Sequence, residues 1–542
     1  MYVTHEATCK SMKKLLVVLA FLAYLAVINP ASHTPTVSAF SSEEATLVRF
    51  TFDGELYAST PPWNTTEAIR DQLQYTIGHL NGDRAVGHLS AVRLSNVRSA
   101  VVGGSIRIRY RAVLPVAWGA SQVPSSYTFL LPRRADYAGV QEFTNRYKST
   151  CVDWGAHDVD AGSLWYYYRP KRPECVLRRS DVISVQATIQ VAKENTAGKY
   201  PEFNRVWNDN ALDVLVVFGK YEAGSTTSAD AGIAAYNQFS GAIKDAFGSD
   251  AVTVPASVPS TPGVKSPDIM FSKTVGGKRT TVTVLLVDKP TLDIAAFDVR
   301  YASLSTSADL IIYNGHSGLG ADVRALARKA SFAAGKYLIF FMNTTVSFAY
   351  LDGSLAERRA VLNPDDPGGT KYMDMVTNAM PAYFASMPSA SLAFIRGLMD
   401  PVAPHTYDEM LSMVDASQVA LVTGEEDNTY TPGPGDGAVT EWTGMNDAAF
   451  VARGEERLYE TPLLGAGLYT FTMTHDTAHA GGDADLYVRM DQRPTTSVYD
   501  CRPFRTGSDE ECEIQLATPT RLFVVVRGYA DRDSHFRLTG RR

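Results

Sequence analysis

Residues 308–343 read ADLIIYNGHSGLGADVRALARKASFAAGKYLIFFMN, and this stretch decides the fold that we expect for the middle of the chain. It runs from an apolar segment through a glycine-rich turn into a helix-like segment and then into a second apolar segment. Alternating strands and helices predict a parallel sheet with helices on both faces. Functional loops of such sheets follow the carboxyl ends of strands. The turns at 314–320 and 343–347 are therefore the first candidates for a functional site.

The same alternation extends over residues 205–424 and predicts a three-layer α/β domain. Strand-like runs stand at 211–219 and 279–288, and a helix-like run at 229–248 ends in glycine. Two later segments also read as helices, and they span residues 369–387 and 404–415.

Residues 42–200 predict a separate α+β domain. The run 45–52 alternates like a strand, and 64–82 reads as an amphipathic helix with Asn64 as its N-cap. The aromatic run LWYYYRP at 164–170 has two interpretations: a strand with one face in a core, or an exposed binding surface.

The C-terminal part of the chain follows a change in composition. Residues 425–440 hold Pro, Gly and acidic residues without an apolar period, which is typical of a linker. Residues 441–542 then carry short alternating strands at regular spacing, and this pattern predicts an all-β sandwich. With 542 residues the chain is too long for a single core, so a multi-domain protein is expected.

The N-terminus predicts export. Lys13 and Lys14 precede an apolar run from Leu15 to Val27, and small residues up to Ala39 follow. This order is typical of a secretory signal, so we expect removal of residues 1–39 and a secreted, periplasmic or cell-surface protein without a remaining membrane span. The alternative is an uncleaved N-terminal anchor, although the apolar run is short for a bilayer span.

Four cysteines follow the predicted signal, and export permits disulfides. The economical pairing joins Cys151 to Cys175 and Cys501 to Cys512. The alternative for the first pair is metal binding together with His157 and Asp158, but the spacing matches no common zinc pattern. With both pairs oxidised, no cysteine is left as a nucleophile.

The net charge of the chain bears on the class of binding partner. The formal net charge is −7, and nucleic-acid recognition requires a basic surface. The charge therefore argues against a nucleic acid as partner. For an exported protein of this kind, we expect a protein or an extracellular or cell-surface ligand.

The C-terminal series GGDADLYVRMDQRPTTSVYDCRPF, continued by RLFVVVRGYADRDSHFRLTG, resembles the bacterial pre-peptidase C-terminal domain. The resemblance implies a jelly-roll-like sandwich appended to secreted hydrolases, with a role in secretion, folding or adhesion. The carboxylates of Asp483 and Asp485 suggest a Ca²⁺ site through oxygen ligands, with Asp531 or Asp533 as further donors. The alternative is that these carboxylates cap turns or pair with arginines.

The central series of strand, Gly-His-Ser-Gly turn, helix and strand is similar in layout to the caspase–gingipain-like cysteine peptidases. The resemblance implies that His316 stands at the position of the base, with Gly315 or Gly318 as an oxyanion donor. At the position of the nucleophilic cysteine the chain has Thr344 and Thr345, and Ser347 follows. A thiolate is far more nucleophilic at neutral pH than an alcohol beside a lone histidine.

Two other interpretations of the turn at 314–320 remain open. The first is a serine-hydrolase elbow with Ser317 as nucleophile, for which Asp400 and His405 would complete a triad. That pattern requires glycine where Leu319 stands. The second is a glycine turn in which His316 caps a helix or satisfies local backbone.

The sequence therefore predicts a secreted, peptidase-like protein without hydrolytic activity that binds a protein or surface partner. The alternative is an active peptidase or esterase in which His316 acts with Thr345, Ser347 or Ser317. No cofactor is indicated besides the Ca²⁺ considered for the C-terminal domain.

Overall fold

The computed structural model describes residues 45–542, except for 63, 121, 196–199, 402, 415–417, 429, 431, 433–441, 480, 491 and 517–519. The predicted signal at 1–39 lies outside the described residues, as does most of the predicted linker. In the part of the chain that is described, no helix has the length and apolar character needed to cross a membrane.

The first domain is built on an antiparallel sheet with the strand order β2-β4-β1-β6-β5, and β3 pairs with β4. Helix α2 packs on this sheet and is capped by Asn64, whose side chain accepts from the backbone N–H of Thr66 and Glu67. The α+β class is therefore as predicted. Its elements are β1 (Thr46–Ala58), α2 (Thr65–Asn81), β2 (Ala85–Gly87), β3 (Arg93–Val102), β4 (Ser105–Trp118), β5 (Ser126–Pro132), α3 (Tyr137–Tyr147), α4 (Leu164–Tyr167) and β6 (Val182–Val191).

The aromatic run at 164–170 is not a strand. Residues Leu164–Tyr167 form the single helical turn α4, which buries Leu164 and Trp165 beside α2. The run is short, and packing against the helix decides its conformation over the β propensity of aromatic residues.

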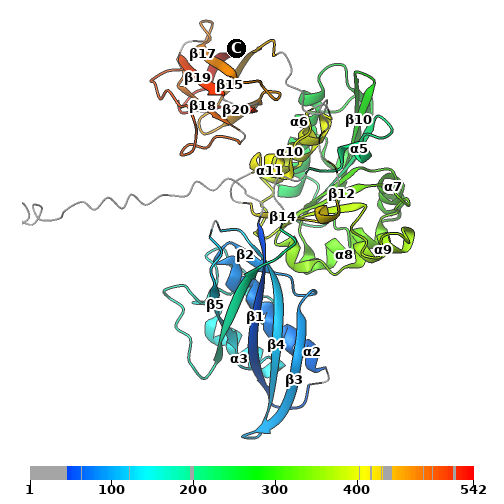
Figure 1. Ribbon diagram of the computed structural model, residues 1–542, viewed down its shortest axis with the longest axis vertical. Coiled ribbons are helices and arrows are strands. Elements are labelled where there is room, and N and C mark those ends of the chain that lie inside the picture. Colours follow the sequence, from blue (N-terminus) through cyan, green and yellow to red (C-terminus); the bar gives the residue numbers. More distant parts are fainter. Residues whose placement is uncertain are drawn as a thin grey trace, which may run out of the picture. The chain divides into compact units, whose positions relative to one another are not determined.

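The central domain is an eight-stranded sheet with the order β14-β13-β12-β11-β7-β10-β9-β8 (Figure 1). The five strands from β13 to β10 are parallel, whereas β14 and β9 run antiparallel to their neighbours. The strands are β7 (Ala211–Gly219), β8 (Val252–Val254), β9 (Asp268–Val275), β10 (Lys278–Val287), β11 (Leu310–Gly315), β12 (Leu338–Thr344), β13 (Met373–Asn378) and β14 (Ala420–Thr423).

Helices cover both faces of this sheet, which gives the predicted three layers. One core contains side chains of α6, α10 and α11, and the other contains side chains of α7, α8 and α9. The helices are α5 (Phe203–Val206), α6 (Ala231–Phe247), α7 (Ala295–Ser305), α8 (Ala321–Lys329), α9 (Ser354–Leu362), α10 (Met387–Met399) and α11 (Tyr407–Ser412).

Two boundaries of the central domain differ from the expectations. The segment 369–387, expected to be helical, contains strand β13, because pairing between β12 and β14 outweighs its helix-like apolar period. Residues 428 and 430, expected to lie in the linker, pack on this domain, since Asn428 donates to Asp374 and Tyr430 contacts Phe203.

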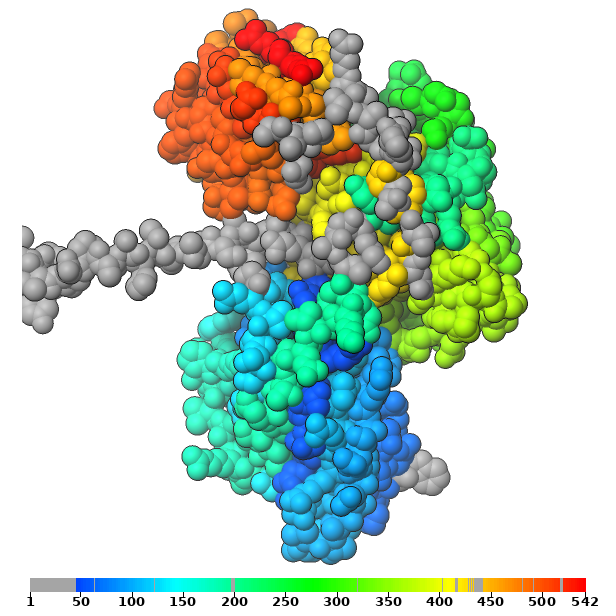
Figure 2. Space-filling view, in the orientation of Figure 1, coloured from blue at the N-terminus to red at the C-terminus, as the bar shows by residue number. Residues whose placement is uncertain are grey.

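The C-terminal domain is a sandwich of a four-stranded sheet (β15-β21-β17-β19) and a three-stranded sheet (β16-β20-β18), as the strand pattern predicted. Figure 2 shows it as a block of orange and red surface. Apolar side chains from both sheets fill one core, and Cys501 and Cys512 form a disulfide beside it. The strands are β15 (Met445–Val451), β16 (Glu456–Glu460), β17 (Gly467–His475), β18 (Ala484–Met490), β19 (Glu510–Leu516), β20 (Leu522–Gly528) and β21 (Ser534–Arg541).

Candidate functional site

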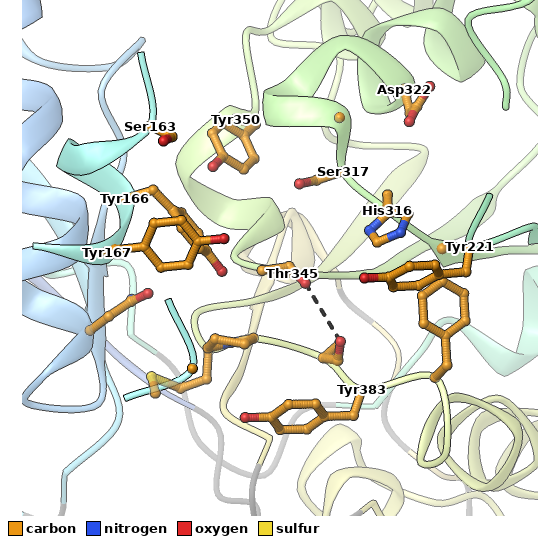
Figure 3. Close-up of a pocket in the computed structure, with 18 of the residues that line it drawn as sticks. Ser163, Tyr166, Tyr167, Tyr221, His316, Ser317, Asp322, Thr345, Tyr350 and Tyr383 are labelled. Atoms are coloured by element: carbon orange, nitrogen blue, oxygen red, sulfur yellow. Dashed lines mark hydrogen bonds between the residues drawn. The ribbon is translucent and has the colours of Figure 1, made fainter. Parts of the chain in front are cut away.

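A cavity of about 810 Å³ lies at the carboxyl ends of β11 and β12. The turn after β11 contributes His316 and Ser317, and the turn after β12 contributes Thr345. Figure 3 shows these three side chains together, with Tyr166 and Tyr167 of the first domain facing them. Two of the strand ends that the sequence singled out therefore line one cleft.

Glycines shape the turn that carries His316. A Cβ added at Gly315 would lie 2.7 Å from the Tyr313 hydroxyl oxygen, and Tyr313 donates to the carbonyl of His316 at 2.9 Å. Gly320 has φ +90°, and a Cβ there would approach Tyr350 to 2.9 Å. Glycine is therefore required where the chain leaves the sheet and turns into α8.

The His316 imidazole lies between two aromatic rings. Its centroid is 4.9 Å from that of Tyr221 and 5.3 Å from that of Phe384. Burial lowers the pKa of His316, and the charge of Lys289 lowers it further. The ring is therefore neutral at neutral pH, which is the state that a general base requires.

Asp322 is the buried carboxyl of this cleft. It lies in the first turn of α8, and its Oδ1 accepts the backbone N–H of Thr291 at 3.2 Å. Burial raises its pKa, although the hydrogen bonds from Thr291 and the charge of Lys289 favour the ionised form. The approach of Thr291 to α8 is not visible in the local sequence pattern.

The candidate hydroxyl groups differ in their surroundings. Thr345 is half-buried, and its Oγ1 lies 3.5 Å from the carbonyl of Ala382 (Figure 3). Ser317 is 6% exposed. Among the described residues, no hydrogen bond joins the His316 ring to either hydroxyl.

Ser347 has a structural position instead. It is fully buried in the short 3₁₀ helix Ser347–Tyr350, where its hydroxyl donates to the carbonyl of Met342 at 2.7 Å and accepts from the N–H of Asn378 at 2.8 Å. It does not line the cleft. The structure therefore does not support Ser347 as a nucleophile.

The serine-hydrolase triad is not assembled either. His405 is buried, and its Nε2 lies 3.0 Å from both Arg521 Nη1 and Glu460 Oε1 of the C-terminal sandwich. Neither His405 nor Asp400 lines the cleft that contains Ser317. The order of Asp and His along the chain suggested a triad, and the fold places the histidine elsewhere.

A ladder of asparagines supports the floor of the cleft. Asn343 donates to Asn314 at 2.7 Å, and Asn378 donates to Asn343 at 3.0 Å. Asn314 is further bonded to Ser391 of α10. These amides link the carboxyl ends of β11, β12 and β13, so they fix the turns that hold His316 and Thr345 relative to one another.

Tyrosines form the opposite wall. Tyr166 and Tyr167 come from α4, Tyr350 follows β12, and Tyr383 follows β13. Sequence reasoning missed this role for Tyr350 and Tyr383. The run at 164–170 did carry the signal, since a binding surface was one of its two interpretations.

The segment that presents Tyr166 and Tyr167 is closed by the predicted disulfide between Cys151 and Cys175. His157 lines the cleft but is not joined with these cysteines in a metal site, because both sulfurs are oxidised. The bond closes a loop that would otherwise be long and irregular, so it holds the aromatic wall in place.

The surroundings of Asp483 and Asp485 do not fit Ca²⁺. Asp485 is paired with the guanidinium of Arg502 at 2.7 Å, and Asp483 accepts the N–H of Gly507 at 2.7 Å. A bound arginine supplies the positive charge that a calcium ion would bring. The pairing of Asp485 is with Arg502, and Arg527 pairs with Glu456 instead.

Comparison with known proteins identifies the class of the C-terminal domain. Residues 467–528 match the family model described as "Bacterial pre-peptidase C-terminal domain". The resemblance drawn from the sequence is therefore confirmed for this domain, which carries no candidate catalytic residue.

The relatives found by sequence are proteases. A protein named "Zinc metalloprotease" from Helicobacter pylori is 42% identical over 73 residues, which is 12% of this chain and 28% of the relative. "Hemagglutinin/proteinase" from Vibrio cholerae is also 42% identical over 73 residues, 12% of each chain. This chain thus spans well under a third of the length of these relatives.

Two solved structures each match a small part of this chain. The pre-peptidase C-terminal domain of collagenase from Bacillus anthracis is 13% identical, with a TM-score of 0.16, and the match covers 18% of this chain and 88% of that one. "Solution structure of vEP C-ter 100" is 30% identical, with a TM-score of 0.14, and covers 16% of this chain and 82% of that one.

Proposed function

We propose that the central domain is a caspase-like relative of cysteine peptidases whose cleft binds polypeptide without hydrolysing it. The observation that carries the proposal is the cleft at the ends of β11 and β12, which is lined by both His316 and Thr345. In the proposed layout these residues take the positions of the base and the thiol. The protein acts after export, and its pre-peptidase C-terminal domain aids secretion or adhesion.

The strand order supports the first part of this proposal. From β10 through β7, β11, β12 and β13 the strands are parallel, and the edge strand β14 is antiparallel. The base and nucleophile positions then follow adjacent strands, as the caspase-like layout requires. The asparagine ladder holds these two strand ends in register.

The arrangement of side chains in the cleft supports the absence of hydrolytic activity. An alcohol becomes a nucleophile only with a hydrogen-bonded base, and the base in turn needs an orienting partner. The hydroxyl of Thr345 is directed to the carbonyl of Ala382 instead of His316. Both cysteine pairs in the described chain are oxidised, so neither supplies a thiol.

The lining of the cleft supports a polypeptide as ligand. The volume of about 810 Å³ is in the range of ligand sites, and several amino-acid side chains fit into it. Tyrosines give apolar contact area together with hydroxyl groups that can bond to peptide backbone. The net charge of −7 argues against a nucleic acid.

The competing function is an active hydrolase. The neutral imidazole of His316 favours it, because a lowered pKa keeps the ring in the unprotonated form that a general base requires. In this case Thr345 or Ser317 would have to turn toward His316 when substrate binds.

Installing a thiol tests the proposal directly. We expect the wild type and His316→Ala to cleave fluorescein-labelled casein equally poorly. Thr345→Cys should react with iodoacetamide about tenfold faster than the double variant Thr345→Cys/His316→Ala, because a nearby imidazole raises the thiolate fraction. Wild-type cleavage that is lost in both His316→Ala and Thr345→Ala would establish the hydrolase instead.

Binding is measured separately with the same probe. We expect the anisotropy of labelled, unfolded casein to rise with the wild type, and Tyr166→Ala and Tyr167→Ala to weaken binding about tenfold. The control is Tyr137→Ala, since Tyr137 is 82% exposed and does not line the cleft. Equal binding by all four proteins would overturn the assignment of the cleft.

A further inference from the structure

The C-terminal sandwich holds a cluster of two histidines and one aspartate at one end of its four-stranded sheet. Asp476 follows β17 directly, His479 lies three residues further in the same loop, and His535 lies in β21. One ligand atom from each of these side chains lies within 4.8 Å of the others. In the described part of the chain, no other trio of His, Cys, Asp or Glu side chains meets this criterion.

Backbone hydrogen bonds bring the loop and the strand together. The N–H of Asp476 donates to the carbonyl of His535 at 3.1 Å, and the N–H of His479 donates to the carbonyl of Asp476 at 3.0 Å. Asp476 Oδ1 also accepts the N–H of Ala478 at 3.0 Å, which closes the turn. The backbone positions of the three residues are therefore set by the fold.

The side chains already face one another. His479 Nδ1 lies 2.8 Å from Asp476 Oδ2, and the rings of His479 and His535 are stacked at 3.9 Å with an interplanar angle of 9°. His535 is also backed by the ring of Phe450 at 5.2 Å. His479 and Asp476 keep 53% and 41% of their side-chain surfaces exposed, so an ion can reach them from solvent.

We propose that Asp476, His479 and His535 bind a divalent transition-metal ion, with Zn²⁺ as the type. Two imidazole nitrogens and one carboxylate oxygen form a donor set that suits zinc, whereas Ca²⁺ and Mg²⁺ take oxygen ligands. Three protein ligands leave a fourth position of the tetrahedral ion for water or for a donor from a partner. This site is independent of the central cleft and of the function proposed for it.

Binding requires a small, definite rearrangement. Zinc–ligand bonds of about 2.0 to 2.2 Å place two ligands of one ion at most about 4 Å apart, so the cluster must contract slightly. The ion must also lie near the plane of each ring that it contacts, and two stacked, parallel rings cannot both meet this condition. His479 therefore has to rotate off His535, and its exposure leaves room for that movement.

A second histidine–aspartate pair at the same end of the sheet provides a matched control. His475 is bonded to Asp509 through Nδ1 at 2.8 Å, and its side chain is 56% exposed. It resembles His479 in residue type, exposure and carboxylate partner but lies outside the cluster. A general affinity of surface histidines for zinc would depend on His475 as much as on His479.

The test is a zinc titration of the exported full-length protein at pH 7.5, with a chromophoric zinc indicator as competitor. We expect one saturable equivalent in the wild type, at least tenfold weaker binding in His479→Ala and in His535→Ala, and unchanged binding in His475→Ala. Millimolar Ca²⁺ should not displace the zinc. Lowering the pH to 5.5 should release it, because protons compete for the imidazoles.

Asp476→Asn separates a ligand role from a structural role. Its amide oxygen can keep the turn bond to Ala478 while the negative ligand is lost. We expect weaker zinc binding with an unchanged melting temperature of the metal-free protein, and zinc should raise the melting temperature of the wild type more than that of the variant. Absence of saturable binding, or equal losses in His475→Ala and His479→Ala, would overturn the proposal.

Discussion

The two ends of the central sheet each bury a polar network, and the networks are built from opposite chemistry. At the carboxyl end, neutral amides of Asn314, Asn343 and Asn378 bond to one another across three strands. At the amino end, the carboxyl of Asp374 accepts from the hydroxyls of Tyr337 and Tyr407, and both networks are almost fully buried.

Strand β13 belongs to both networks, since it begins beside Asp374 and ends at Asn378. The amide network pairs its donors with acceptors and carries no charge. The carboxyl network has one oxygen of Asp374, Oδ1, without a hydrogen-bond partner among the described residues. The amide network beside the cleft therefore keeps its hydrogen bonds over a wide pH range. At the amino end, ionisation of Asp374 lowers the free energy of unfolding.

Replacing the middle amide should have the largest effect. Asn343→Leu keeps the volume but leaves the buried amide of Asn378 without its acceptor and removes a donor from Asn314. We expect a loss of about 4 kcal/mol in the free energy of unfolding, because unsatisfied buried polar groups cost about 1 to 3 kcal/mol each. Urea unfolding at pH 7 measures it.

The control for this prediction is Asn204→Ala, because Asn204 is exposed on α5. Its unfolding free energy should remain within about 0.5 kcal/mol of the wild type. A loss below about 1 kcal/mol in Asn343→Leu would show that the ladder does not stabilise this end of the sheet.

Ionisation at the amino end should have the next largest effect. Burial raises the pKa of Asp374 to about 6, against about 3.9 in an unfolded chain. Between these values the folded state binds the proton more tightly, so stability falls as the pH rises from about 4 to about 6 and then levels off. The cost at neutral pH is about 2 to 3 kcal/mol.

Asp374→Asn isolates this contribution, because its amide oxygen can still accept from Tyr337, Tyr407 and Asn428. Urea unfolding between pH 4 and pH 7 should show the variant gaining about 2 to 3 kcal/mol on the wild type as the pH rises. Asp53→Asn, at a carboxyl that is 74% exposed, serves as the control and should follow the wild-type profile. If the unfolding free energies of Asp374→Asn and the wild type changed with pH in parallel, the two ends of the sheet would not differ in their response to pH.

The sequence predicted those parts of this arrangement that depend on local pattern. The order of strand, turn, helix and strand in 308–343 and the capped helix at 64–82 follow from apolar periodicity and cap residues, which act within a few positions. Strand β13 was not predicted, because its conformation depends on strands that flank it only after folding.

For the candidate site, too, only the features that depend on local sequence could be predicted. His316 and Thr345 follow adjacent apolar runs, so their place at one edge of the sheet could be inferred. The approach of Tyr166 to the cleft depends on a contact between distant segments, so the aromatic run at 164–170 suggested a binding surface but not its position. An asparagine at the end of each of three consecutive strands was a signal in the sequence, and it indicates the ladder only once the strands are known to be parallel neighbours.

The smallest effect separates two hydroxyls at the carboxyl end. Ser347 bridges Met342 and Asn378 in the interior, whereas among the described residues the Thr345 side chain has only the long hydrogen bond to Ala382. Ser347→Ala should therefore lower the unfolding free energy by about 1 to 2 kcal/mol, and Thr345→Ala should change it by less than about 0.5 kcal/mol. Equal losses in both variants, measured by urea unfolding at pH 7, would mean that Thr345 also serves the fold. The presence of threonine instead of cysteine at position 345 would then be explained by the stability of the fold, and not by binding in the cleft.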